Sequence, residues 1–365
     1  MSSERAYLDW NAGAPLRPEA RTAMLAALDI VGNPSSPHAE GRRVRAIVED
    51  AREEVAALVG AKPTEVVFTS GATEANNAVV AGGWEAILLA DIEHDSVLAP
   101  ARRWAGADPA GLTPARLLEL AVDSNGRVSV EAVAQHGVGA MAAGTGARRL
   151  LSLQLANNET GIVQPVAAAA ETARSQGLAV HTDAVQAAGR MPVSFRTLGV
   201  DYLSLSAHKL GGPKGIGALV IRDSAQLPAF IAGGGQERRR RAGTENVPAI
   251  AGFGAAARAA VRDLATIDRV RALRDRVESE VRAITPSAVV IGADAERLPN
   301  TASIALPGAS AETLVIALDL AGVAVSAGAA CSSGKVGASR VLEAMGLAPA
   351  LARAAIRVSL GWGST

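Results

Sequence analysis

The sequence is poor in several kinds of residue, and each shortage excludes a class of protein. A single cysteine, Cys331, excludes an internal disulfide, so nothing points to an oxidising compartment. Basic and acidic residues balance at 36 each, which gives no electrostatic footprint for nucleic acid or an anionic membrane. No charge-free apolar run is long enough to span a bilayer, and residues 1–10 lack the apolar run of a signal peptide. We therefore expect a cytoplasmic protein that binds neither nucleic acid nor a membrane directly.

Lysine is also scarce, and nearly all of the positive charge is arginine. The 365 residues include only Lys62, Lys209, Lys214 and Lys335. Chemistry that needs an amine nucleophile therefore has few candidates. The composition is otherwise that of a globular protein, with 49% hydrophobic residues, and the length allows a large core.

Short apolar runs alternate with amphipathic stretches along the first two thirds of the chain. Residues 41–60 have the clearest helical periodicity, with Gly60 as the C-cap. Buried strands are predicted at 65–69, 86–90, 149–156, 178–182, 201–206 and 216–221. The alternation predicts an α/β fold with a mostly parallel sheet, in which functional side chains gather at the carboxyl ends of the strands.

The pattern changes near residue 250. Residues 249–285 predict a long, interrupted helix, and short strands follow at 302–307, 323–328 and 355–361. We expect this helix to join two domains. A large domain would cover 15–250, and a smaller one would combine 1–14 with 251–365.

Polar side chains follow several of the predicted strands. Each has an ordinary explanation when taken alone, such as a helix cap, a turn or a structural histidine. In chain order they supply a helix start at Thr73, the imidazole of His94, the amide of Asn158, the carboxylate of Asp183 and the amine of Lys209. Because the carboxyl ends of parallel strands meet at one edge of a sheet, we expect these groups to lie together.

Together these groups are the parts of a pyridoxal 5'-phosphate (PLP) site. A lysine forms the Schiff base with this cofactor, and a carboxylate keeps its pyridine nitrogen protonated. A helix N-terminus offers unpaired backbone N–H groups and a partial positive charge to the phosphate. The sequence therefore predicts a PLP-dependent enzyme.

The sequence resembles the cysteine desulfurases of the class V aminotransferase family from residue 7 to about residue 361. The segments that carry the resemblance, in the family's order, are "SGATEAN", "EHDSVL", "NNETG", "HTDAVQ", "SAHKLGGPKGIGAL", "GGGQERRRRAGTEN" and "AGAACSSG". Related aminotransferases share the lysine segment but lack the cysteine segment. The resemblance implies PLP-dependent fold type I, with a mostly parallel seven-stranded sheet in a large domain and a smaller α+β domain.

The resemblance also implies roles for individual residues. Lys209, Cys331 and His94 are implied as catalytic, with Cys331 as the sulfur acceptor and His94 stacked on the cofactor ring. The implied cofactor-binding residues are Ala72, Thr73, His94, Asn158, Asp183, Gln186, Ser206, His208, Lys209 and Thr244. The implied substrate-binding residues are Asn11, Asn158 and Arg357. No resident metal is implied, and Cys331 could ligate an iron–sulfur species only during sulfur transfer.

The implied reaction converts L-cysteine to L-alanine and leaves a persulfide on Cys331. The persulfide would pass to an iron–sulfur scaffold or another sulfur-acceptor protein. Thr244 is implied to reach the phosphate held by a second subunit, which implies a homodimer. The small residues around Cys331 suit a surface loop, and the spacing to the next helix resembles the desulfurase subgroup with an extended mobile cysteine loop. A free thiol is mostly protonated at neutral pH, and both His94 and Lys335 stay open as the activating group.

Other functions share parts of this pattern. A selenocysteine lyase has the same scaffold and differs in its preference for selenium. A class V aminotransferase needs no cysteine and requires a keto-acid acceptor. A non-catalytic sulfur-transfer scaffold would need neither PLP nor Lys209, and the complete set of cofactor residues disfavours it.

Overall fold

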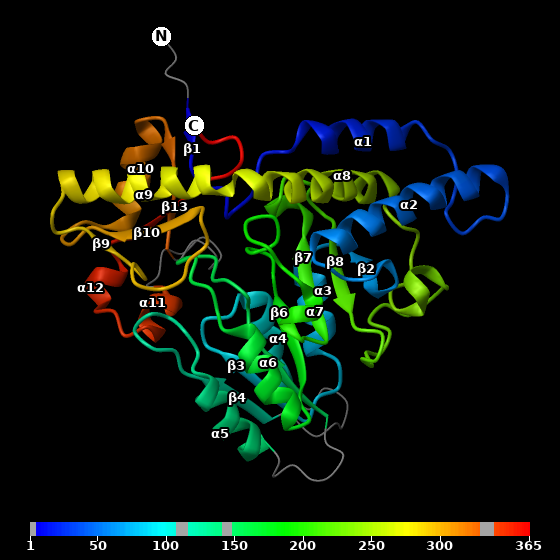
Figure 1. Ribbon diagram of the computed structural model, residues 1–365, viewed down its shortest axis with the longest axis horizontal. Coiled ribbons are helices and arrows are strands. Elements are labelled where there is room, and N and C mark those ends of the chain that lie inside the picture. The colour runs from blue at the N-terminus through cyan, green and yellow to red at the C-terminus, as the bar shows by residue number, and fades with distance from the viewer. Residues whose placement is uncertain (1–4, 107–115, 141–147, 329–338) are drawn as a thin grey trace.

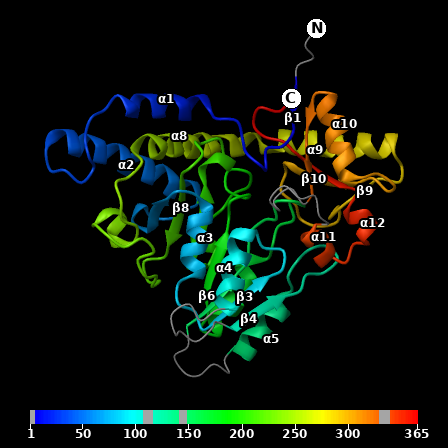
Figure 2. The ribbon, with the colours of Figure 1, turned by 180° about the vertical axis from the view of Figure 1, so that it is seen from behind.

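The computed structural model describes residues 5–106, 116–140, 148–328 and 339–365 (Figures 1 and 2). Within these residues the largest sheet has seven strands in the order β2-β8-β7-β6-β5-β3-β4. The strands are β2 (Val66–Thr69), β3 (Ala86–Ala90), β4 (Arg116–Leu120), β5 (Arg149–Ser152), β6 (Ala179–Asp183), β7 (Tyr202–Ser206) and β8 (Gly217–Ile221). Neighbours from β7 to β4 pair in parallel, whereas β8 is antiparallel to both β2 and β7. The predicted, mostly parallel seven-stranded sheet is confirmed.

Helices cover both faces of this sheet, which explains why its strands are almost continuously apolar. Successive residues of a strand point to opposite faces, so Val67 packs in one hydrophobic cluster and Phe68 in another. The first cluster contains α3 (Ala72–Val80) and α4 (Asp95–Gly106). The second contains α2 (Ala39–Leu58), α6 (Val166–Ser175) and α8 (Val247–Asp263). The remaining helices of this part are α1 (Pro18–Leu28), α5 (Val130–Ala140) and α7 (Phe195–Leu198).

The long helix predicted at 249–285 is present and interrupted. Helix α8 gives way to a 3₁₀ turn at Leu264–Thr266, after which α9 (Ile267–Ile284) continues in nearly the same direction (Figure 1). Beside α9 lies a four-stranded antiparallel sheet in the order β12-β13-β10-β9. The division of the chain into domains at residues 15 and 250 stays a prediction.

The predicted strand at 323–328 divides between two sheets. Its first part, β11 (Val323–Ala324), pairs in parallel with β1 (Ala6–Tyr7), and its second part, β12 (Ser326–Ala327), pairs with β13 (Ala355–Ser359). A bridge between Asp9 and Ser359 also joins the N-terminal segment to the end of β13. The other elements here are β9 (Val289–Val290), β10 (Thr301–Ala305), α10 (Ala311–Leu320), α11 (Arg340–Ala344) and α12 (Pro349–Ala352).

Strand β4 was not among the predicted strands. It lies at the edge of the large sheet and pairs only with β3 among the described residues. Most of its side chains are exposed or half-buried, so its sequence lacks the apolar run that marks the inner strands. No helix in the described part of the chain is both long and apolar enough to cross a membrane.

Candidate active site

A cavity of about 520 Å³ lies where several strands of the large sheet end. Its walls combine residues that follow β2, β3, β5, β6 and β7 with Asn11 from the N-terminal segment and Arg357 from β13. The predicted site residues on these walls are Asn11, Ala72, Thr73, His94, Asn158, Asp183, Gln186, Ser206, His208, Lys209 and Arg357. Thr244 is exposed and does not line the cavity, and Cys331 lies outside the described residues, as does the predicted cysteine loop.

Lys209 ends the short 3₁₀ turn Ala207–Lys209 that follows β7. Its Nζ donates to the backbone carbonyl oxygens of Asn11 and, at 3.0 Å, of Ala12. Both carbonyls belong to the N-terminal segment, so residues almost 200 positions apart in sequence place this amine. Lys209 also lines the cavity, where a bound molecule can contact it.

Asp183 and His94 are joined by Asn76 and Ser96, which lie in the quoted segments "SGATEAN" and "EHDSVL" but were assigned no role from the sequence. Asn76 on α3 is fully buried, and its Nδ2 donates to Asp183 Oδ2 at 2.7 Å and to Ser96 Oγ at 2.8 Å. Ser96 in turn lies 2.8 Å from His94 Nδ1 and donates its backbone N–H to the same nitrogen. Because Nδ1 accepts from that N–H, a neutral His94 carries its proton on Nε2.

The carboxylate of Asp183 keeps acceptor capacity toward the cavity. Asp183 is only 8% exposed at the end of β6, and its Oδ1 accepts the backbone N–H of Val185 at 2.9 Å. Two carboxylate oxygens offer about four lone-pair directions, so these contacts do not exhaust them. A cationic ring N–H presented from the cavity would therefore find a partner here.

The start of α3, Ser206, His208 and Lys214 also line the cavity. Burial, and then the charges of Lys209, Lys214 and Arg190, lower the pKa of His208 to about 4. His208 is therefore neutral near pH 7 and offers hydrogen bonding rather than charge. Beside His208, positive charge on the cavity wall comes from Lys209 and Lys214 and from the partial charge of the α3 N-terminus.

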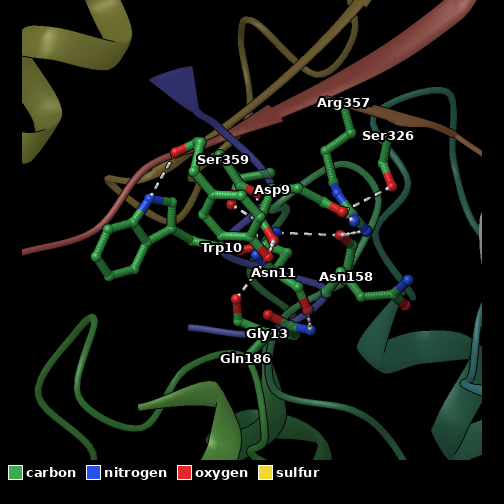
Figure 3. A network of polar contacts seen from close by, with 12 residues as sticks. Asp9, Trp10, Asn11, Gly13, Asn158, Gln186, Ser326, Arg357 and Ser359 are labelled. Carbon is green, nitrogen blue, oxygen red and sulfur yellow. Dashed lines mark hydrogen bonds and ion pairs between the residues drawn. The ribbon is translucent and has the colours of Figure 1, made fainter. Parts of the chain in front are cut away.

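Arg357 lies in the middle of β13 and is almost fully buried. Figure 3 shows its guanidinium beside Asp9 and Asn158. Nη2 pairs with Asp9 Oδ1 at 2.6 Å, and Nη1 donates to the Asn158 carbonyl at 3.0 Å. The same carbonyl accepts Asn11 Nδ2 at 3.1 Å. The Nε of Arg357 is buried without a hydrogen-bond partner among the described residues.

Arg190 is a buried neighbour of the site that the sequence did not reveal. It donates to the side chain of Gln186 and to the carbonyl oxygens of Trp10 and Lys209. Burial, and then the charge of Arg357, lower its pKa to about 9, which still leaves it charged at neutral pH. Arg190 thus fixes Gln186, whose Nε2 donates to the Asn11 carbonyl at 3.2 Å.

Glu159 follows Asn158 in the "NNETG" turn and is buried. It accepts a short hydrogen bond from the hydroxyl of Ser339, the residue that precedes α11. Burial raises the pKa of Glu159 to about 7, although the Ser339 hydrogen bond and the charges of Arg357 and Arg340 lower it and Asp95 raises it. Glu159 therefore titrates near neutral pH. It lies between Asn158, which lines the cavity, and Ser339, which precedes α11.

Glu159→Gln is expected to stabilise the protein at pH 8. The folded protein holds the Glu159 proton more tightly than the unfolded chain does, so ionising this group costs stability as pH rises from about 4.5 to about 7. The shift corresponds to about 3 kcal/mol above that window, and the neutral glutamine avoids the cost. Thermal unfolding should show a higher midpoint for the variant at pH 8 and little difference at pH 4.5.

The control for this prediction is Glu119→Gln, at an exposed residue of β4. The control should show no pH-dependent difference from the wild type. Since all three proteins share the same histidines, their titration cancels from the comparison. A Glu159→Gln variant that is less stable than the wild type at pH 8 would contradict the prediction.

The residues on the cavity walls fit PLP. Hydroxyls, a neutral imidazole, a lysine and a helix start suit a phosphate, Asp183 suits the pyridinium, and Lys209 suits a carbonyl carbon. Arg357, a buried guanidinium that lines the cavity, suits the carboxylate of an amino acid. All of these groups line one cavity. The order of strand ends predicted this for Thr73, Asp183 and Lys209, whereas Arg357 was implied by the resemblance.

Comparison with known proteins supports the same assignment. The model of the family described as "Aminotransferase class-V" matches residues 6–365. The chain belongs to the class V aminotransferase family. This is a class of PLP-dependent enzymes, so the predicted enzyme class is confirmed.

The similar proteins include cysteine desulfurases. The cysteine desulfurase of Cereibacter sphaeroides is 43% identical over 370 residues, covering 99% of this chain and 92% of that protein. The NifS-like protein of Rickettsia africae has a TM-score of 0.88 at 30% identity, covering 99% of this chain and 95% of that one. A structure described as SspA in complex with cysteine has a TM-score of 0.80 at 28% identity, covering 97% of this chain and 98% of that one. The resemblance to cysteine desulfurases and the predicted fold type are confirmed, whereas the roles of individual residues stay predictions.

Proposed function

We propose that this protein is a PLP-dependent cysteine desulfurase that converts L-cysteine to L-alanine and carries the sulfur as a persulfide on Cys331. The observation that carries the proposal is the convergence of Lys209, Asp183 and Arg357 on one cavity. An amine, a buried carboxylate and a buried guanidinium in that arrangement suit a cofactor aldehyde, a pyridinium and an amino-acid carboxylate.

We propose a role for each of these cavity residues. Lys209 would hold PLP covalently, Asp183 would face the pyridine nitrogen, Gln186 would bond the ring oxygen and His94 would stack on the ring. The backbone of Ala72 and the side chains of Thr73, Ser206 and His208 would hold the phosphate. We propose that Thr244, exposed on this chain, reaches the phosphate in a second copy, which makes the working enzyme a homodimer.

The protein would bind the amino acid by its carboxylate and remove the proton from its Cα. PLP, when bound, supplies an electron sink that makes the Cα proton acidic. Arg357, Asn158 and Asn11 would bind the carboxylate and so fix which Cα–H bond faces Lys209. The Lys209 amine, once free, would remove that proton as the general base and return protons to the product.

The sulfur step needs no external oxidant or reductant. The Cys331 thiolate attacks the substrate sulfur, the bond between that sulfur and Cβ breaks, and its electron pair stays with the carbon. A sulfur–sulfur bond forms on Cys331, and protonation of the carbon gives alanine. His94 and Lys335 both stay open as the group that deprotonates the thiol. We propose a cytoplasmic iron–sulfur scaffold, or another sulfur-acceptor protein, as the recipient.

The test is a product balance on the PLP-loaded wild-type protein with L-cysteine and a reductant. A desulfurase releases L-alanine and sulfide in equal amounts. A class V aminotransferase would release neither without added keto acid, and it would form a new amino acid when a keto acid is supplied. Faster turnover of L-selenocysteine by orders of magnitude would favour a selenocysteine lyase. Cofactor colour without sulfide would overturn the proposal.

A further inference from the structure

Arg357 is already paired with a carboxylate of its own chain. Asp9 Oδ1 lies 2.6 Å from Arg357 Nη2, and the Ser326 hydroxyl donates to Asp9 Oδ2 at 3.3 Å (Figure 3). The Arg357 side chain is 2% exposed and that of Asp9 is 18% exposed, so water screens this pair weakly. A substrate carboxylate bound at Arg357 must therefore share the guanidinium with Asp9.

The surroundings make Asp9 the direct counter-charge at this end of the cavity. In the part of the chain that the structure describes, no other carboxylate lies within ion-pair distance of Arg357. The neighbouring Arg190 donates to uncharged acceptors, the carbonyls of Trp10 and Lys209 among them. Arg190 has no ion-pair partner among those residues. Without the charge of Asp9, the buried Arg357 would have none either.

We propose that Asp9 weakens the hold of Arg357 on the amino-acid carboxylate and thereby sets how readily the product leaves. The inference rests on the proposed function, since it takes Arg357 as the carboxylate-binding residue. L-cysteine and L-alanine carry the same α-carboxylate, so a guanidinium that bound it too tightly would retain the product as well as the substrate. A fixed negative charge beside the ligand lowers the affinity of both, because it repels the carboxylate and already neutralises its partner.

Charge and orientation can be separated at this position. Arg357 keeps a second hold through Nη1, which donates to the Asn158 carbonyl at 3.0 Å. Asp9→Asn keeps the shape of the side chain and an oxygen that can accept from Arg357, and it removes the charge. If Asp9 only oriented Arg357, removing the charge would weaken the binding of a carboxylate or leave it unchanged.

The experiment measures binding of L-alanine to the PLP-loaded protein by calorimetry, without turnover. Asp9→Asn is expected to bind L-alanine about tenfold more tightly than the wild type. L-alaninamide, which lacks the carboxylate, should gain no affinity. Asp9→Glu keeps the charge and should stay near the wild type. Asp9→Ser is a second neutral variant that should show the same gain if Asp9→Asn folds poorly.

The matched control is Asp263→Asn. Asp263 Oδ2 lies 2.6 Å from Nη1 of Arg17, another buried arginine, and this pair does not line the cavity. This control should leave L-alanine binding at the wild-type value even where it lowers the unfolding temperature. Weaker or unchanged L-alanine binding in the neutral Asp9 variants would overturn this inference and leave the proposed function standing. A wild type that fails to bind L-alanine would overturn the proposed function, and the inference with it.

Discussion

Replacing Lys209 by alanine is expected to abolish the release of alanine and sulfide from L-cysteine. The side chain has two proposed tasks, to hold PLP covalently and to move the Cα proton. Loss of a positioned general base alone lowers a rate by roughly 10²–10⁴-fold, and loss of the covalent hold adds to this. We expect turnover at least roughly 10³-fold below the wild type. The measurement is the initial rate of alanine formation at saturating PLP and L-cysteine.

Lys209→Arg separates this chemistry from a structural effect. Lys209 Nζ donates to the Asn11 and Ala12 carbonyls, and an alanine would leave both acceptors without this donor. An arginine remains a cation and a donor, but it forms no Schiff base and is always protonated. Both variants should therefore be inactive, while Lys209→Arg retains more of the wild-type stability.

Lys62→Ala is the matched control, because Lys62 pairs with Asp223 on the exposed surface. It should keep wild-type turnover and cofactor content. Borohydride reduction followed by peptide mass analysis should place the cofactor on Lys209 in the wild type. More than a tenth of wild-type activity in Lys209→Arg would contradict the assigned role of this amine.

The parts of the site that the sequence predicted are those that follow a buried strand. Asp183 and Lys209 come at or just after the ends of β6 and β7, and parallel strands bring their ends to one edge. The hydrophobic periodicity, the turn residues and the order of strands and helices along the chain were enough to predict that these groups would meet. Arg357 was different, because it lies inside a strand of the second sheet and was found only through the resemblance.

The residues that orient the site were not predictable by the same reasoning. Asn76 lies on a helix that begins at residue 72 and meets Asp183 across 107 positions of sequence. Asp9 meets Arg357 across 348 positions, because β1 pairs with β11 beside the second sheet. A pattern within one segment gives no information on such contacts. The exposed edge strand β4 was missed for a different reason, since its residues lack a continuous apolar run.

Replacing Cys331 by alanine is expected to remove sulfide formation. Cys331 is the only thiol of the chain, and the proposed reaction needs a thiolate to accept the substrate sulfur. No other side chain of this protein can form a persulfide. Sulfide and alanine should both fall at least about a hundredfold in the presence of reductant, because alanine forms only after the sulfur has left.

The cofactor chemistry should survive in this variant, which distinguishes a missing acceptor from a damaged site. Cys331→Ala should bind PLP and L-alanine as the wild type does, since none of the described residues that line the cavity is changed. Exchange of the L-alanine Cα proton with deuterium from the solvent reports on Lys209 without any sulfur step. That exchange should continue in Cys331→Ala and stop in Lys209→Ala.

Cys331→Ser and Ser332→Ala complete the comparison. A serine keeps the size and polarity of cysteine but ionises far less readily and cannot carry the sulfur, so it should be as inactive as alanine. Ser332→Ala changes the neighbouring residue and keeps the thiol, and it should retain sulfide release. Equal amounts of alanine and sulfide from Cys331→Ala at the wild-type rate would refute the assignment of Cys331 as the acceptor. In that case a thiol of the added reductant would have to take the sulfur from the substrate, because direct loss of sulfide would give pyruvate and ammonia instead of alanine.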